Sequence, residues 1–138
     1  MTLLATLIAC AGSGLPVHTL DVSGNKVRAE LAFTDQSRQN GLMNRDSMGA
    51  DDGMLFIYRD EAIRGFWMKD TRIPLSIAFA NRHGEIVKIA DMTPFDQSRV
   101  SSLAPAMYAL EMNKGWFEEH GVKKGDTIGG LPTDVAVE

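Results

Sequence analysis

The residues best suited to chemistry in this chain lie in the run 65–75, which reads Gly-Phe-Trp-Met-Lys-Asp-Thr-Arg-Ile-Pro-Leu. Side chains alternate between the faces of a strand, so Trp67 and Lys69 are expected on one face and the neighbouring Phe and Met on the other. An aromatic ring beside Lys69, Asp70 and Thr71 would give a small ligand both contact area and orienting polar groups. The alternative is scaffold, in which Trp67 packs under a loop and Asp70 and Thr71 form a turn.

Two arginines, Arg38 and Arg45, flank a Gly-Leu-Met turn. Because a guanidinium offers a planar fork of donors, the pair is a candidate clamp for an anionic ligand. A charge near a core is normally paired, however. The competing prediction is therefore an internal ion pair, in which Arg38 or Arg45 contacts Glu111 or Asp70.

Glu111 follows Tyr-Ala-Leu in an otherwise apolar segment. A carboxylate in such surroundings can act as a general base with a raised pKa. No nucleophile or second acid accompanies it in an obvious motif, so we expect Glu111 to be the partner of an arginine or of Lys69. The sequence therefore predicts no catalytic residue and favours a protein that is not an enzyme.

Metal and cofactor chemistry have little support in the sequence. His18, His83 and His120 lie far apart, without the spacing of metal ligands. Of the eight methionines, four that lie in predicted strands are expected to fill gaps in the core and not to bind a soft metal ion: Met54, Met68, Met107 and Met112. The chain has neither a Gly-x-Ser-x-Gly elbow nor a glycine-rich phosphate loop before a helix. We therefore predict no metal site and no cofactor.

The elements that must position these residues are short. Alternating apolar residues and frequent turn signals predict many strands and little helix. Strands are expected at 17–22, 26–33, 53–58, 65–68, 75–80, 85–92, 105–112 and 127–128, short helices at 35–40 and 114–120, and a loop at 93–104. This pattern predicts an all-β fold with one or two short helices, a small β-sandwich or barrel-like single domain.

Composition supports one ordinary domain. The chain has 138 residues, of which 44% are hydrophobic and 23% charged, with a formal net charge of −4. This length and apolar content suit a single core, expected to span residues 17–138. Lys and Arg are scattered among acids, so no basic face for nucleic acid is expected. We expect a monomer whose partner, if any, is a small polar or anionic molecule.

The first residues predict export. Residues 1–11 are mostly apolar and too few to span a bilayer, as in a secretory signal or a lipoprotein signal. Leu-Ile-Ala-Cys ending at Cys10 is similar to a bacterial lipobox, which makes Cys10 a lipidation candidate and residues 12–16 a flexible tether. Ordinary cleavage at Ala-Cys-Ala and a buried N-terminal helix remain alternatives. The expected location is the bacterial cell envelope, with contact to the membrane only through a lipid anchor.

Several ordered motifs are similar to one known family. They are Arg-Gln-Asn-Gly-Leu-Met-Asn-Arg at 38–45, Gly-Met-Leu-Phe at 53–56, Phe-Trp-Met-Lys-Asp-Thr at 66–71, Ile-Pro-Leu at 73–75, Leu-Glu at 110–111 followed by Gly115, and Gly-Asp at 125–126. Over about residues 22–129 the chain resembles the domain of unknown function 192 family. One departure is Asp70, where the family pattern often has Asn.

The resemblance implies a β-rich, sandwich-like fold and a small bacterial protein that is often secreted or lipid-anchored. It implies no activity. Two functional hypotheses therefore remain. The favoured one is a non-catalytic envelope binding or accessory domain with a small polar and aromatic cleft, formed by Arg38, Arg45, Trp67, Lys69, Asp70, Thr71 and Glu111. The alternative is an envelope enzyme similar to hydrolases, with Glu111 or Asp70 as its acid or base.

Overall fold

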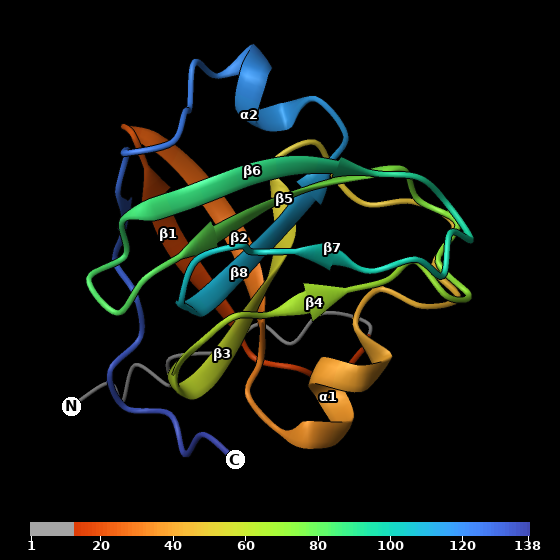
Figure 1. The fold of residues 1–138 in the computed structure, drawn as a ribbon, viewed down its shortest axis with the longest axis horizontal. Coiled ribbons are helices and arrows are strands. Elements are labelled where there is room, and N and C mark those ends of the chain that lie inside the picture. Colours follow the sequence, from red (N-terminus) through yellow and green to blue (C-terminus); the bar gives the residue numbers. More distant parts are fainter. Residues whose placement is uncertain (1–12) are drawn as a thin grey trace, which may run out of the picture.

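A computed structural model describes residues 13–138 as nine strands and two short helices (Figure 1). The elements are β1 (Val17–Val22), β2 (Asn25–Ala32), α1 (Asp35–Asn40), β3 (Asp52–Ala62), β4 (Gly65–Phe66), β5 (Leu75–Ala80), β6 (Ile86–Met92), β7 (Val100–Ser101), β8 (Ala106–Asn113), α2 (Trp116–Glu119) and β9 (Ile128–Gly129). The prediction of an all-β fold with short helices is confirmed.

Seven of the strands form one curled sheet in the order β6-β5-β8-β3-β2-β1-β9. The curl makes the sheet a half-barrel, which holds strands far apart in the sequence close together (Figure 1). Strand β8 is an interior strand, third in this order, and is antiparallel to β3 on one side and to β5 on the other. The two remaining strands, β4 and β7, form a separate antiparallel ribbon. A side chain on β8 is therefore held by two neighbouring strands.

Strands β2 and β3 are parallel, and α1 forms part of the connection between them. Thr34 caps this helix: its hydroxyl accepts from the Ser37 amide, and the Ser37 hydroxyl accepts from the Thr34 amide. This capping box satisfies amides that a helix start leaves unpaired. Gly41 ends the helix at φ 47°, a left-handed conformation that glycine adopts without strain. The start and end of α1 agree with the prediction for 35–40.

Apolar side chains cover both faces of the sheet. On one face, residues of β1, β2, β6 and β8 pack with Trp116 and Phe117 of α2. On the other, Met54 and Phe56 of β3 and residues of β5 pack with the β4 segment and with the loop after α1. The second cluster lies between the sheet and the β4–β7 ribbon, and Glu111 projects into it.

The predicted strand at 65–68 is shorter than expected, because β4 ends at Phe66. The chain leaves the ribbon at Trp67 and turns at Asp70, which has φ 51°. The segment 93–104, predicted as a loop, contains the two-residue strand β7. Strand β3 runs to Ala62, beyond the predicted 53–58, past an irregularity in its pairing with β8.

The described start of the chain already contacts the sheet. The Ser13 hydroxyl donates to Glu30, and the Pro16 carbonyl accepts from the Leu31 amide. Within residues 13–138, no helix combines the length and the apolar character needed to cross a bilayer. Cys10 and the predicted signal segment lie outside the described residues.

Candidate functional site

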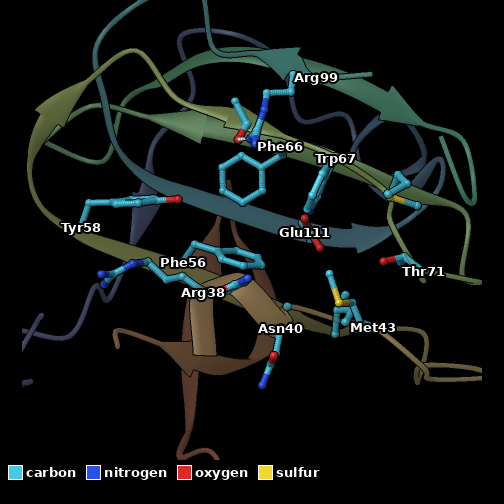
Figure 2. A pocket seen from close by; sticks show the side chains of 15 residues that line it. Arg38, Asn40, Met43, Phe56, Tyr58, Phe66, Trp67, Thr71, Arg99 and Glu111 are labelled. Atoms are coloured by element: carbon cyan, nitrogen blue, oxygen red, sulfur yellow. Dashed lines mark hydrogen bonds between the residues drawn. The ribbon is translucent and has the colours of Figure 1, made fainter. Parts of the chain in front are cut away.

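A pocket of about 350 Å³ opens between α1, the β4 segment and the central strands β3 and β8 (Figure 2). Its wall combines polar and apolar side chains, and the rings of Phe56 and Phe66 are in edge-to-face contact, with 4.9 Å between their centres. Figure 2 draws the lining residues, which are Arg38, Gln39, Asn40, Gly41, Leu42, Met43, Phe56, Tyr58, Gly65, Phe66, Trp67, Met68, Thr71, Arg99 and Glu111. The pocket thus joins residues from five separate parts of the sequence.

Glu111 is the acidic residue of this pocket, and its carboxylate points into the space (Figure 2). It lies on β8 directly opposite Met54 of β3 and Ile77 of β5. Its side chain is almost enclosed, since only 4% of the residue is exposed. The pairing of β8 on both sides fixes the position of this side chain, so the carboxylate is part of the rigid sheet.

Within the described residues, the Glu111 carboxylate has neither a hydrogen-bond donor nor a salt-bridge partner. Desolvation by burial is the cause that raises its pKa, from 4.5 to about 8. A carboxyl group with this pKa carries its proton at neutral pH, because the charged form lacks compensation in apolar surroundings. The pocket therefore contains a neutral acid, and a donor or a cation that reaches it would favour the anion.

Two cations lie beside Trp67 at the rim. The Arg99 guanidinium carbon is 5.1 Å from the centre of the indole ring, and the Lys69 amine is 5.5 Å from it. Arg99 also donates to the Gly65 carbonyl at 3.3 Å. Trp67 is half-buried and lines the pocket. Its ring thus holds positive charge at the rim of the pocket through cation–π attraction.

Arg38 lines the pocket, but its guanidinium already has partners. It donates to the Ile57 carbonyl at 2.9 Å, to the Glu138 carbonyl at 2.7 Å and to the Asp35 carboxylate at 2.6 Å. Its charge also lies over the ring of Tyr58, with 5.0 Å between the guanidinium carbon and the ring centre. Arg38 therefore ties α1 to β3 and to the C-terminal residues.

Arg45 lies outside this pocket and forms an ion pair with Glu30 through two hydrogen bonds. Burial acts to raise the pKa of Glu30, but donors from Arg45 and Ser13 outweigh it and lower that pKa. The prediction that Arg38 or Arg45 pairs with Glu111 or Asp70 is wrong. The nearby acids Asp35 and Glu30 take these arginines instead, so Glu111 is left without a partner.

The Asp70–Thr71 turn matches the scaffold alternative for these two residues. The Thr71 amide donates to the Met68 carbonyl at 3.2 Å, and Asp70 has a left-handed backbone. Asn and Asp tolerate this conformation better than most residues, which explains why either suits this corner. Asp70 is exposed, and its carbonyl accepts from the Asn44 amide at 2.9 Å. Of the two, only Thr71 lines the pocket.

Comparison with known protein families identifies the family of this chain. The family profile described as uncharacterized ACR, DUF192, matches residues 18–130. The chain belongs to the DUF192 family. The resemblance noted in the motifs is thereby confirmed, over nearly the range expected from them.

Two solved structures are similar to this DUF192 domain. A protein of unknown function from Novosphingobium aromaticivorans is 32% identical, with a TM-score of 0.85 over 90% of this chain and 93% of its own. A protein from Sinorhizobium meliloti described as a candidate transcription regulator is also 32% identical, with a TM-score of 0.79 over 83% of this chain and 93% of its own. No curated protein matches the chain.

The sequence-predicted residues of this DUF192 domain divide into two groups. Arg38, Trp67, Thr71 and Glu111 line one pocket, whereas Arg45, Lys69 and Asp70 do not. Sequence reasoning missed Arg99 and Tyr58, which also line it. Arg99 lies directly before β7, and only the pairing of β7 with β4 brings it beside Trp67. Tyr58 alternates with Phe56 on β3, and that period could have placed it on the same face.

Proposed function

We propose that this DUF192 domain is a non-catalytic binding domain of the cell envelope, which holds a small polar ligand in the pocket around Glu111. One observation carries the proposal. Glu111 is buried on β8, an interior strand of the sheet, among apolar neighbours and with no partner among the described residues. A buried ionisable group without a partner is unfavourable for folding. Such groups tend to occur at functional sites, where a ligand supplies the missing partner.

The neighbours of Glu111 strengthen this interpretation. Met54 and Ile77 flank it on the adjacent strands, so a leucine or methionine at this position would suit the core better. Aromatic and aliphatic walls with a few convergent polar groups are typical of small-molecule sites. Thr71, which is buried, and Trp67, which is half-buried, also line the pocket and carry further polar atoms.

The enzyme alternative has weaker support. Acid–base hydrolysis commonly needs two carboxylates or a nucleophile beside a base. Among the residues that line the pocket, Glu111 is the one carboxylate, and Asp70 is exposed outside it. Glu111 has a pKa near neutrality, which suits proton transfer, but the lining shows no second group for it to act with.

The envelope location rests on the sequence of residues 1–16 and remains a proposal. The Sinorhizobium meliloti protein is described as a candidate transcription regulator, but this chain does not have the charge pattern of a protein that binds nucleic acid. The formal net charge of the chain is −4, and several arginines are bound to neighbouring acids. This charge pattern lacks the basic surface that binding to nucleic acid requires.

Thermal unfolding of the wild type, Glu111→Leu and the exposed control Glu119→Gln tests the proposal. We expect Glu111→Leu to raise the free energy of unfolding by roughly 1–4 kcal/mol at neutral pH, because an uncompensated buried acid is replaced by an apolar side chain. A panel of sugars, amino acids and peptidoglycan fragments should then include compounds that stabilise the wild type and the control, but not Glu111→Leu.

Two outcomes would contradict the proposal. A marked loss of stability in Glu111→Leu would mean that the carboxyl group serves the fold. Compounds that stabilise Glu111→Leu as much as the wild type would place the binding site elsewhere on the molecule.

A further inference from the structure

The two ends of the pocket carry opposite chemical character. Arg99 lines the rim, and Lys69, which does not line the pocket itself, lies against the same Trp67 ring; both side chains are exposed. At the floor is Glu111, which is buried and unpaired. A ligand that spans the pocket therefore meets positive charge at one end and an acid at the other.

The rim cations are available to a ligand. Arg99 has a long hydrogen bond to the Gly65 carbonyl and its contact with Trp67. Within residues 13–138, neither Arg99 nor Lys69 forms a salt bridge with a carboxylate. Arg45, Arg64 and Arg72, in contrast, each bind an acid at 4.0 Å or less. An anionic group at the rim would thus gain two partners without breaking an existing ion pair.

The charged and titratable groups that face Glu111 come from three other elements. They are Arg38 on α1, Tyr58 on β3 and Arg99 before β7. Arg38 is already bound to Asp35 and to two carbonyls, so it contributes a fixed background of positive charge. Tyr58 lies between Arg38 and Arg64, with guanidinium carbons 5.0 and 3.9 Å from its ring centre. None of these groups neutralises Glu111 as an anion through direct contact.

We propose that the ligand is a small zwitterion, such as an amino acid, whose anionic group binds Arg99 and Lys69 and whose ammonium group binds Glu111. The inference rests on the proposed binding function and specifies the ligand class. An anion alone would satisfy the rim and leave the acid unpaired. A cation alone would pair Glu111 and meet repulsion at the rim. A neutral sugar would supply no charge at either end.

This arrangement couples binding to proton release. Before a ligand binds, the Glu111 carboxyl group keeps its proton at neutral pH, because its pKa is about 8. An arriving ammonium retains its own three hydrogens and favours the carboxylate form, so the Glu111 proton leaves to solvent. Binding should therefore release close to one proton per ligand, to an extent that falls as the pH rises above about 8.

Titration calorimetry of the full chain with a series of ω-amino acids tests the proposal. The series is glycine, β-alanine, γ-aminobutyrate and 5-aminovalerate, which differ only in the distance between amine and carboxylate. Butyrate and butylamine are the single-charge controls. We expect one chain length to bind best and both controls to bind at least roughly tenfold more weakly. Runs in phosphate and in Tris, whose ionisation heats differ, should report about one proton released per ligand.

Three variants locate the two ends of the ligand. Glu111→Gln should lose the proton release and at least roughly tenfold in affinity for the best amino acid. Arg99→Gln should weaken that amino acid and butyrate alike, because it removes the anion partner. Arg72→Gln, an exposed arginine bound to Asp46 outside the pocket, is the matched control and should bind as the wild type does.

Several results would overturn the inference. Butyrate binding as tightly as γ-aminobutyrate would mean an anion site, and an absence of binding by the whole series would exclude the zwitterion class. If neutral sugars bind in a Glu111-dependent way while amino acids do not, the inference fails and the proposed binding function stands. Binding that is unaltered in Glu111→Gln would contradict both.

Discussion

Two buried glutamates of this domain, Glu30 and Glu111, differ in whether a cation pairs with the side chain. Glu30 is 6% exposed and Glu111 is 4% exposed, and each lies on a strand with apolar neighbours. Glu30 has Arg45 as its partner and a lowered pKa, whereas Glu111 has a raised pKa. The sequence places both on strands, but it does not show which acid receives an arginine. That choice depends on the three-dimensional position of the loop that carries Arg45.

The first prediction concerns Glu111 and pH. Its pKa in the folded protein is about 8, above the ordinary 4.5, so the folded state binds more protons than the unfolded state between these values. The contribution of Glu111 to stability is thus fully present below about pH 4.5 and is lost as pH rises to about 8, on the order of 1.4 kcal/mol per pKa unit. Glu111→Gln should remove this dependence.

Urea unfolding of the wild type, Glu111→Gln and Glu119→Gln at a series of pH values between these limits measures the effect. The difference between wild type and Glu111→Gln should shift in favour of the variant as pH rises. Glu119→Gln changes an exposed acid of α2 and should follow the wild type. Parallel profiles for all three proteins would mean that Glu111 ionises normally in the folded state.

At the scale of elements, the sequence predicts the bounds of those strands and helices that depend on apolar alternation and on a capping residue. The predicted ranges 17–22, 35–40 and 75–80 coincide with β1, α1 and β5, since apolar periods and the Thr34 cap are local signals. The parallel pairing of β2 with β3 and the two-residue β7 have no local signal. They follow from how the ribbon and α1 close over the sheet, and these same contacts form the pocket.

The second prediction concerns the start of α1. Thr34→Ala removes the two hydrogen bonds of the Thr34 hydroxyl, which accepts from the Ser37 amide and donates to the Ser37 hydroxyl, and should lower the free energy of unfolding by about 1 kcal/mol. Because Arg38, Asn40 and Leu42 line the pocket, ligand affinity should fall as well. Chemical unfolding and calorimetry measure the two effects. Thr93→Ala, at an exposed loop position, is the control, and an equal effect there would exclude a capping role.

The third prediction concerns the close approach of β3 and β8. A Cβ atom at Gly53 would lie 2.4 Å from the Met112 sulfur and 2.5 Å from the Glu111 carbonyl oxygen. Gly53→Ala should therefore destabilise the domain by about 1–3 kcal/mol or more, since the backbone itself must shift. In Gly65→Ala the new atom would meet only the flexible Arg99 side chain, at 3.3 Å. Equal melting temperatures for the two variants would contradict this account.

At the scale of the whole molecule, the fold and the family follow from sequence, and the location remains a prediction. Short alternating strands indicate the all-β class, and ordered motifs indicate the DUF192 family. The absent partner of Glu111 could not be predicted, because isolated sequence motifs do not reveal which charges meet. For the same reason the sequence motif alone suggests an Arg38–Arg45 clamp, although in the fold Arg45 pairs with Glu30.

The fourth prediction concerns the N-terminal segment. We expect Cys10 to become the first residue of the mature protein and to carry a lipid, because Leu-Ile-Ala-Cys is followed by small residues. Mass spectrometry of membrane fractions from a bacterium that expresses the full chain measures this. Cys10→Ser should abolish the modification and leave the protein unprocessed or soluble. Soluble wild-type protein that starts at Gly12 would instead support ordinary signal cleavage.

The floor and the rim of the pocket should differ in mobility, because the floor carries Glu111 on β8, an interior strand of the sheet. Backbone amides of β8 are held between β3 and β5, so they should exchange hydrogen with solvent only when the whole domain opens. The segment 95–99, which carries Arg99, is exposed, and its backbone hydrogen bonds are made with loop residues rather than with strands of the sheet. A bound ligand should therefore slow exchange at the rim and leave the rates at the floor unchanged. Substitutions at the rim alone can therefore change which ligands bind, while Glu111 keeps its position on the sheet.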